Sequence, residues 1–308
     1  MSEKKIVKSK KYTKNKKLEQ RQKKEKINAL NTYVRECEHQ NLKMQLIERT
    51  EPLRPRVVIS FSTIPSRVNK LAPLFKALKS QTYKPDAIYL NIPKRSIRDD
   101  CEYDIEWHTY NNAKFLKINH MERDYGPLTK LIGGLQQETE PDTIIVTIDD
   151  DKQYDSHMIE DLVTYSQKFF NTGRVCAVGR RGWILCRPEL RWPSFSYLPI
   201  ALDIKTPVNV DVLTGVGAVA YRRSMFDDTF PNDELLEKCF MVDDIYINGY
   251  LAQHGIERIL IPSYPNIFMK LMKTTHTDNT YIDDNPLWNK NKDGVNNNRA
   301  LKLFRQYF

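Results

Sequence analysis

The sequence predicts an α/β protein with a mixed, mostly parallel central sheet flanked by helices. Short runs rich in valine and isoleucine alternate with longer segments whose apolar residues recur at helical spacing. This alternation is typical of strand–helix–strand units that form a sheet covered by helices. In addition, residues 143–148 (TIIVTI) form a continuous apolar run, as expected of a strand at the centre of such a sheet.

In the first half of the chain, strand and helix candidates follow one another regularly. We predict strands at 57–63, 86–92, 114–119 and 143–148. We predict helices at 68–81, at 127–137 with a proline in the first turn, and at 156–170 after a cap at Asp155 or Ser156. The helix at 68–81 carries its apolar residues on one face, which is the side that would pack on the sheet.

The second half is less regular. A strand-like run at 211–221 is interrupted by Gly215 and Gly217. Further elements are expected as helices at 233–240 and 245–254 and as a last strand at 257–261. Residues 182–207 are rich in tryptophan, proline, arginine and tyrosine, and we expect a long, ordered loop there.

The charge of the chain is concentrated at its N-terminus. Residues 1–28 contain twelve lysines and arginines against three glutamates, which accounts for the whole net charge of +9. We therefore expect a basic, disordered arm at 1–28, a helical lead-in at 29–54, a main domain at 55–275 and a C-terminal tail at 276–308 that packs on or near the active site. Because the rest of the chain is neutral, a broad nucleic-acid-binding face is not expected.

Other features of composition limit the location. The longest apolar runs are far shorter than the ~20 residues that a membrane span needs. The lysine-rich N-terminus has no apolar segment after it, so no secretory signal is expected. The five cysteines show no paired spacing, which is typical of reduced thiols and indicates a cytoplasmic protein. The sequence does not indicate an oligomeric state.

Three adjacent aspartates are the clearest functional signal. Asp149, Asp150 and Asp151 directly follow the predicted central strand, at the sheet edge where α/β proteins bind ligands. Gathering like charges beside a core is costly unless a cation neutralises them. In an extended segment Asp149 and Asp151 would share one side, and oxygen ligands suit Mg²⁺ or Mn²⁺ that also holds substrate phosphates. The alternative is an acidic turn before a helix, although Asp155 and Ser156 already suffice as caps.

The residues also carry a family resemblance. The segment VVISFSTIPSRVNKLAPLFKALKSQTYKPDAIYLNIP, followed by RDYGPLTKLIGGL and DTIIVTIDDD, resembles nucleotide-sugar glycosyltransferases of the GT-A fold. It is most similar to a family-two-like group with members in bacteria and large DNA viruses. The resemblance spans roughly residues 55–265. It implies a GT-A sheet and metal-dependent sugar transfer from a nucleotide-diphosphate donor, especially a UDP-sugar, to a glycan or other hydroxyl acceptor. A viral chain would act in the host cytoplasm or the virion.

The resemblance also implies roles for residues on the donor side. Asp149 and Asp151 would bind Mn²⁺ or Mg²⁺, although the family usually has a spaced pair rather than three aspartates. The expected donor-binding residues are Thr63, Ile64, Pro65, Arg67, Asp124, Lys130, Asp150, Gly215 and Gly217. Each also has a purely structural alternative: residues 63–67 could form a plain turn, Asp124 could cap the next helix, Lys130 could be solvated, and the glycines could mark a bulge.

The acceptor side depends on Asp243 and Asp244 at a predicted helix start. The resemblance implies that one of them, with Asp244 favoured, is the catalytic base of an inverting transfer; retention stays open. Acids at a helix N-terminus are also favourable for electrostatic reasons alone. His276 is expected as a third metal ligand, with a solvated loop histidine as the alternative.

Two other functions compete with this hypothesis. A nucleotidyltransferase could share the sheet and the metal carboxylates, but such enzymes usually have a glycine-rich loop after the first strand, and STIPSR has no glycine. A non-catalytic binder could instead use residues 1–28 to bind nucleic acid or a membrane surface. We expect no specific nucleic-acid partner.

Overall fold

The computed structural model describes residues 54–105, 116–185, 190, 204–262, 287–291 and 293–308. The chain divides into two units, Met1–Glu48 and Arg49–Phe308, and every described residue belongs to the second. The expected arm at 1–28, nearly all of the expected lead-in at 29–54 and His276 lie outside the described residues. Most of the loop expected at 182–207 does so too.

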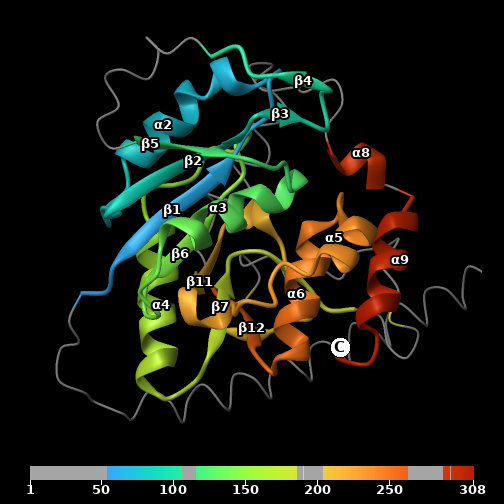
Figure 1. The fold of residues 1–308 in the computed structure, drawn as a ribbon. Helices are drawn as coiled ribbons and strands as arrows, with labels where there is room; N and C mark the ends of the chain where they lie inside the picture. The colour runs from blue at the N-terminus through green and yellow to red at the C-terminus, as the bar shows by residue number, and fades with distance from the viewer. Residues whose placement is uncertain (1–53, 106–115, 186–189, 191–203, 263–286, 292) are drawn as a thin grey trace, which may run out of the picture. The chain divides into compact units, whose positions relative to one another are not determined.

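The core is an eight-stranded sheet in the order β5–β2–β1–β6–β11–β7–β12–β9 (Figure 1). Strands β5, β2, β1 and β6 run parallel to one another, β11 is antiparallel to both of its neighbours, and β12 is parallel to β7. The sheet strands are β1 (Val57–Ser62), β2 (Ala87–Pro93), β5 (Leu116–Met121), β6 (Ile144–Thr147), β7 (Cys176–Gly179), β9 (Val208–Asn209), β11 (Val219–Arg222) and β12 (Glu257–Leu260). The predicted mixed, mostly parallel sheet flanked by helices is confirmed.

Helices cover both faces of this sheet. Helix α3 packs over β1, β2 and β6 (Figure 1), where Gly134 lies against Ser60. Phe61 is next to Ser60 in β1 and therefore points to the other face, where it contacts Phe75 of α2. The helices are α2 (Ala72–Lys79), α3 (Thr129–Gln137), α4 (Met158–Asn171), α5 (Asp233–Cys239), α6 (Asp243–Gln253), α8 (Leu287–Asn291) and α9 (Val295–Phe304). Within the described ranges, none is long and apolar enough to cross a bilayer.

Three predicted elements are divided in the structure. The helix expected at 127–137 consists of the 3-10 turn η3 (Gly126–Leu128) and α3. The helix expected at 68–81 consists of a 3-10 turn, η1 (Val68–Lys70), and α2. Pro73 explains the break, because it has no N–H to donate to the carbonyl four residues earlier. The run at 211–221 consists of β10 (Val212–Leu213), the 3-10 turn η4 (Gly215–Gly217) and β11. The interruption therefore occurs at the two glycines, as predicted.

Several short elements were not predicted. They are β3 (Arg95–Ser96), β4 (Cys101–Glu102), β7, β8 (Gly182–Trp183), β9, α8 and α9, together with the 3-10 turn η5 (Arg223–Met225). Of these, α9 matters most for packing, because it contacts α5 and α6. Gly249 of α6 permits this contact, since a Cβ there would lie 2.3 Å from Cγ of Phe304.

This contact predicts the sign of a stability change. In an unobstructed helix Gly→Ala stabilises by about 1 kcal/mol, but Gly249→Ala must displace the Phe304 ring, so we expect a loss of about 1–3 kcal/mol. Urea unfolding measures the difference, with the exposed Gln253→Ala on the same helix as a near-neutral control. A Gly249→Ala variant more stable than the wild type would contradict the packing of α9 on α6.

Candidate active site

The site begins where two neighbouring parallel strands end. Strands β1 and β6 pair in parallel, with Ser60 opposite Thr147, so the residues that follow them meet at one edge of the sheet. Thr63 Oγ1 donates a hydrogen bond to Asp150 Oδ2 at 2.6 Å. Arg67 Nη1 donates to Asp150 Oδ1 at 2.8 Å. The loop after β1 is thereby joined to the aspartate triplet after β6.

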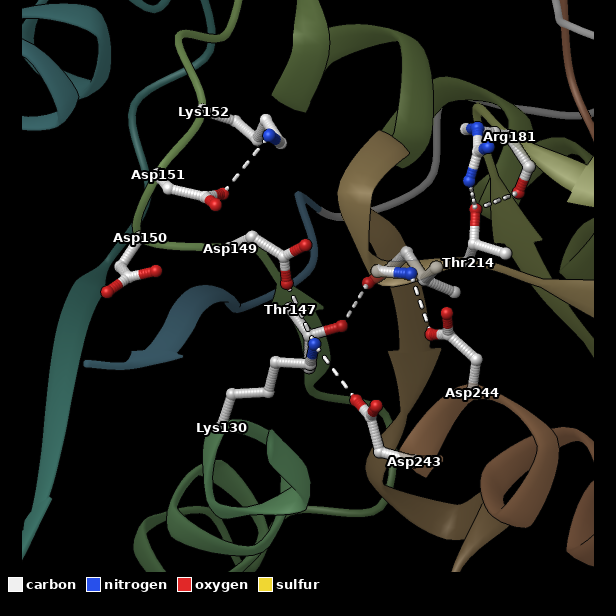
Figure 2. Close-up of polar contacts among 12 residues, drawn as sticks. Lys130, Thr147, Asp149, Asp150, Asp151, Lys152, Arg181, Thr214, Asp243 and Asp244 are labelled. Carbon is white, nitrogen blue, oxygen red and sulfur yellow. Dashed lines mark hydrogen bonds and ion pairs between the residues drawn. The ribbon is translucent and has the colours of Figure 1, made fainter. Parts of the chain in front are cut away.

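The side chains of Asp149 and Asp151 extend to the same side in Figure 2, whereas that of Asp150 points away from them, and the chain turns at Asp150 and Asp151. Asp150 is buried, and burial raises its pKa although Arg67 acts in the opposite direction. The side chain of Asp151 is 21% exposed, with Arg67 Nη1 at 3.5 Å and Lys152 Nζ at 3.4 Å. These longer distances leave Asp151 the more loosely held of the two.

Lys130 of α3 connects the triplet to α6. Its Nζ lies 2.8 Å from Asp149 Oδ1 and 3.0 Å from Asp243 Oδ2 (Figure 2), and its side chain is only 7% exposed. Burial by itself would lower the pKa of Lys130, but the charges of Asp149 and Asp243 outweigh it and raise the pKa well above its ordinary value. The ammonium therefore stays charged between two carboxylates.

Asp244 lies beside this ion pair. Its Oδ1 accepts a hydrogen bond from the backbone N–H of Gly215 at 2.9 Å (Figure 2). Burial, followed by the charge of Asp243, raises the pKa of Asp244 to about 7. Gly215 leaves no room for a side chain, since a Cβ there would lie 2.6 Å from Lys130 Nζ and 3.2 Å from Asp149 Oδ1. The glycine turn η4 thus closes over the carboxylates.

The structure brings together most, but not all, of the predicted site residues. Those joined by direct contacts or close approach are Thr63, Arg67, Lys130, Asp149, Asp150, Asp151, Gly215, Asp243 and Asp244. Ile64 and Pro65 are half-buried in the turn between Thr63 and Arg67. Gly217 packs against Arg181 and not against the carboxylates.

Both carboxylate oxygens of Asp124 accept hydrogen bonds from backbone N–H groups. Its Oδ1 accepts from the backbone N–H of Gly126 at 2.7 Å and its Oδ2 from that of Ile97 at 2.7 Å. Both oxygens thereby hold backbone, in agreement with the alternative that Asp124 stabilises the start of the helix. The corresponding alternative for Lys130, a solvated side chain, is wrong because Lys130 is buried between carboxylates.

Sequence reasoning assigned no role to two further residues at the site. The hydroxyl of Tyr154 accepts from the backbone N–H of Asp149 at 2.9 Å, which holds the start of the turn. Arg181 Nη1 donates to Thr214 Oγ1 at 3.0 Å. Burial lowers the pKa of Arg181, whereas the nearby charges of Asp244 and Asp149 act to raise it. Only the spacing IDDDKQY could have indicated Tyr154.

The carboxylates fit a divalent cation in part. Lys130 contacts Oδ1 of Asp149, and within the described part of the chain Oδ2 forms no hydrogen bond or ion pair, while Asp151 is loosely held. These are two hard oxygen donors near one another in sequence, as a metal with phosphate co-ligands requires. Among the residues that the structure describes, however, no three His, Cys, Asp or Glu side chains are arranged as a complete metal site. Phosphate or other ligands would have to complete the shell.

Replacing Lys130 tests the ion pair. Lys130→Met leaves Asp149 and Asp243 without their buried cation, and we expect the free energy of unfolding at neutral pH to fall by about 3–5 kcal/mol. The matched control is Lys94→Met, because Lys94 pairs with Glu122 on the surface, with side chains 69% and 84% exposed. We expect the control to change stability by less than ~1 kcal/mol. Equal losses in the two variants would contradict the buried bridge.

Asp244 should also make stability depend on pH. With a pKa of about 7 in the folded chain against 3.8 in the unfolded one, the folded state holds this proton more tightly. The stabilisation is therefore complete below about pH 4 and is lost as the pH rises through about 7. Asp244→Asn removes the titration, so its stability relative to wild type should rise between these pH values by up to ~4 kcal/mol. Denaturant unfolding across this range tests it; a constant difference would refute the raised pKa.

Comparison with protein-family models finds no match, and no curated protein matches the chain. A function for this chain must therefore be inferred from its fold and from the chemistry of this site.

Proposed function

We propose that the protein is a metal-dependent glycosyltransferase of the GT-A type. It would transfer a sugar from a nucleotide-diphosphate donor, with UDP-sugars expected, to a hydroxyl group of a glycan or other acceptor, and it would use cytosolic nucleotide sugars. One observation supports the proposal best. At the carboxyl ends of β1 and β6, the aspartate triplet is joined to the loop that carries Thr63 and Arg67 and, through Lys130, to the acidic start of α6.

On the donor side, Asp149 and Asp151 would hold Mn²⁺ or Mg²⁺. When bound, such an ion neutralises the diphosphate as it leaves. Asp150 faces the other way and holds Arg67 and Thr63 in place. The planar guanidinium of Arg67 carries several N–H donors, which suits contacts to the nucleotide.

On the acceptor side, the two acids of α6 have different environments. Asp243 faces the ammonium of Lys130 at 3.0 Å, so its carboxylate is engaged in this ion pair. Asp244 has a pKa of about 7, close to the value that suits a general base at neutral pH. Asp244 would take the proton of the acceptor hydroxyl while that oxygen attacks the anomeric carbon. The bond from this carbon to the diphosphate oxygen breaks, and the diphosphate leaves with the electron pair. This attack from the opposite side gives inversion.

A hydrolysis assay tests the proposal without knowledge of the acceptor. We expect slow hydrolysis of one nucleotide sugar from a UDP- and GDP-sugar panel, lost with EDTA and restored by Mn²⁺. Asp151→Ala should lose this activity, whereas Asp142→Ala should keep it, because Asp142 precedes β6 at the opposite end and its side chain is 74% exposed. Asp244→Asn should lower transfer to an added acceptor by roughly 10²–10⁴-fold. Full activity of Asp151→Ala would remove the metal role, and no turnover of any nucleotide sugar would reject the proposal.

A further inference from the structure

Asn248 connects the helix that carries Asp244 to the strand that leads to Gly215. We propose that Asn248 is a positioning residue for Asp244: it keeps the backbone N–H of Gly215 aimed at the Asp244 carboxylate. An effect of Asn248 on catalysis rests on the proposed function. The hydrogen bonds that hold Asp244 and Gly215 together do not depend on that function.

The side-chain amide of Asn248 pairs with Leu213 as a neighbouring strand would. Its Oδ1 accepts from the backbone N–H of Leu213 at 2.9 Å, and its Nδ2 donates to the Leu213 carbonyl at 2.8 Å. Nδ2 also donates to the carbonyl of Asp244 at 2.6 Å, one turn earlier in α6. On its other side the strand β10 pairs with β8. The side-chain amide of Asn248 therefore takes the place of a second neighbouring strand beside the two-residue strand β10.

The spacing of strand and helix makes this a two-point attachment. Thr214 is extended (φ −119°, ψ 134°), so the N–H groups of Leu213 and Gly215 point to the same side. Leu213 N–H reaches Asn248 and Gly215 N–H reaches Asp244. Two residues of a strand advance roughly 6.6 Å and four residues of a helix roughly 6 Å. The distance between the two N–H groups along the strand therefore matches the distance between Asp244 and Asn248 along the helix, so both hydrogen bonds can form at once.

The attachment has an electrostatic consequence. The Gly215 N–H favours the charged form of Asp244 and opposes the rise of its pKa. Without Asn248 the strand loses one of its two anchors, Gly215 moves away from the carboxylate, and the pKa of Asp244 should rise further. The titratable groups that act on Asp244 from the surrounding elements stay unchanged in an Asn248 variant; they are Lys130, Asp149, Arg181, Tyr221 and Asp243.

Carbon-13 NMR of aspartate carboxyls in the full chain, in EDTA, tests the role directly. The Asp244 signal is the one missing from Asp244→Asn. We expect Asn248→Ala to raise its pKa by roughly one unit, the worth of one hydrogen bond to a charged group. The control is Asn232→Ala, which removes another asparagine-to-backbone hydrogen bond, to Leu235 N–H at the start of α5. An Asp244 shift no larger in Asn248→Ala than in the control overturns the proposal.

Because Asn248 is only 1% exposed, Asn248→Ala can fail to fold, and a measurement on the unmodified chain covers that case. Amide hydrogen exchange should be slow at both Leu213 and Gly215; fast exchange at Gly215 beside slow exchange at Leu213 overturns the proposal. Neither readout needs activity. If the pKa shifts but no nucleotide sugar is turned over, the proposed function fails and the role of Asn248 stands. If turnover occurs and the pKa does not shift, the reverse holds.

Discussion

The buried ammonium of Lys130 is the interaction on which the arrangement of the site depends. A charge with so little access to water needs opposite charges at close range, and its two partners come from the segment after β6 and from the start of α6, far apart in the sequence. The distance between Lys130 and the sheet is set by Gly133 and Gly134, which lie one turn further along α3. A Cβ at Gly133 would lie 2.0 Å from the amide oxygen of Asn91, so glycine lets α3 approach the strands closely.

Much of the fold could be predicted from hydrophobic pattern. The runs at 57–63 and 143–148 became β1 and β6 within one residue at each end, because a strand buried on both faces needs nearly every residue apolar. The pattern failed where an element was very short. Strand β7, with the sequence CAVG, is too brief for periodicity to identify, and its place between β11 and β12 depends on tertiary pairing alone.

The sequence was enough to predict which residues lie at the site, but it predicted less well which of them contact one another. Strand ends indicated Thr63, Arg67 and the aspartates, since parallel neighbours bring such positions together. Asp149 and Asp151 were expected to share one side because the strand was assumed to continue. The Tyr154 hydroxyl holds Asp149 N–H and the chain turns at Asp150 and Asp151, yet the two side chains still extend to one side (Figure 2). The pairing of Lys130 with Asp243 could not be predicted, because nothing in local sequence indicates which helix end meets which lysine. Asn248 escaped notice for the same reason: its partners are backbone atoms of a distant strand.

The position of the antiparallel strand β11 in the sheet has a consequence for how the chain folds during synthesis. Strand β6 gains its second neighbour only from β11, which is synthesised after α4, β7 and the long segment that follows. Until then, a ribosome-bound chain presents β6 (IIVT) as an open edge strand with unpaired backbone groups and three apolar residues, the kind of surface that recruits other chains. Nascent-chain protection by a chaperone is thus most needed while residues 148–218 are emerging.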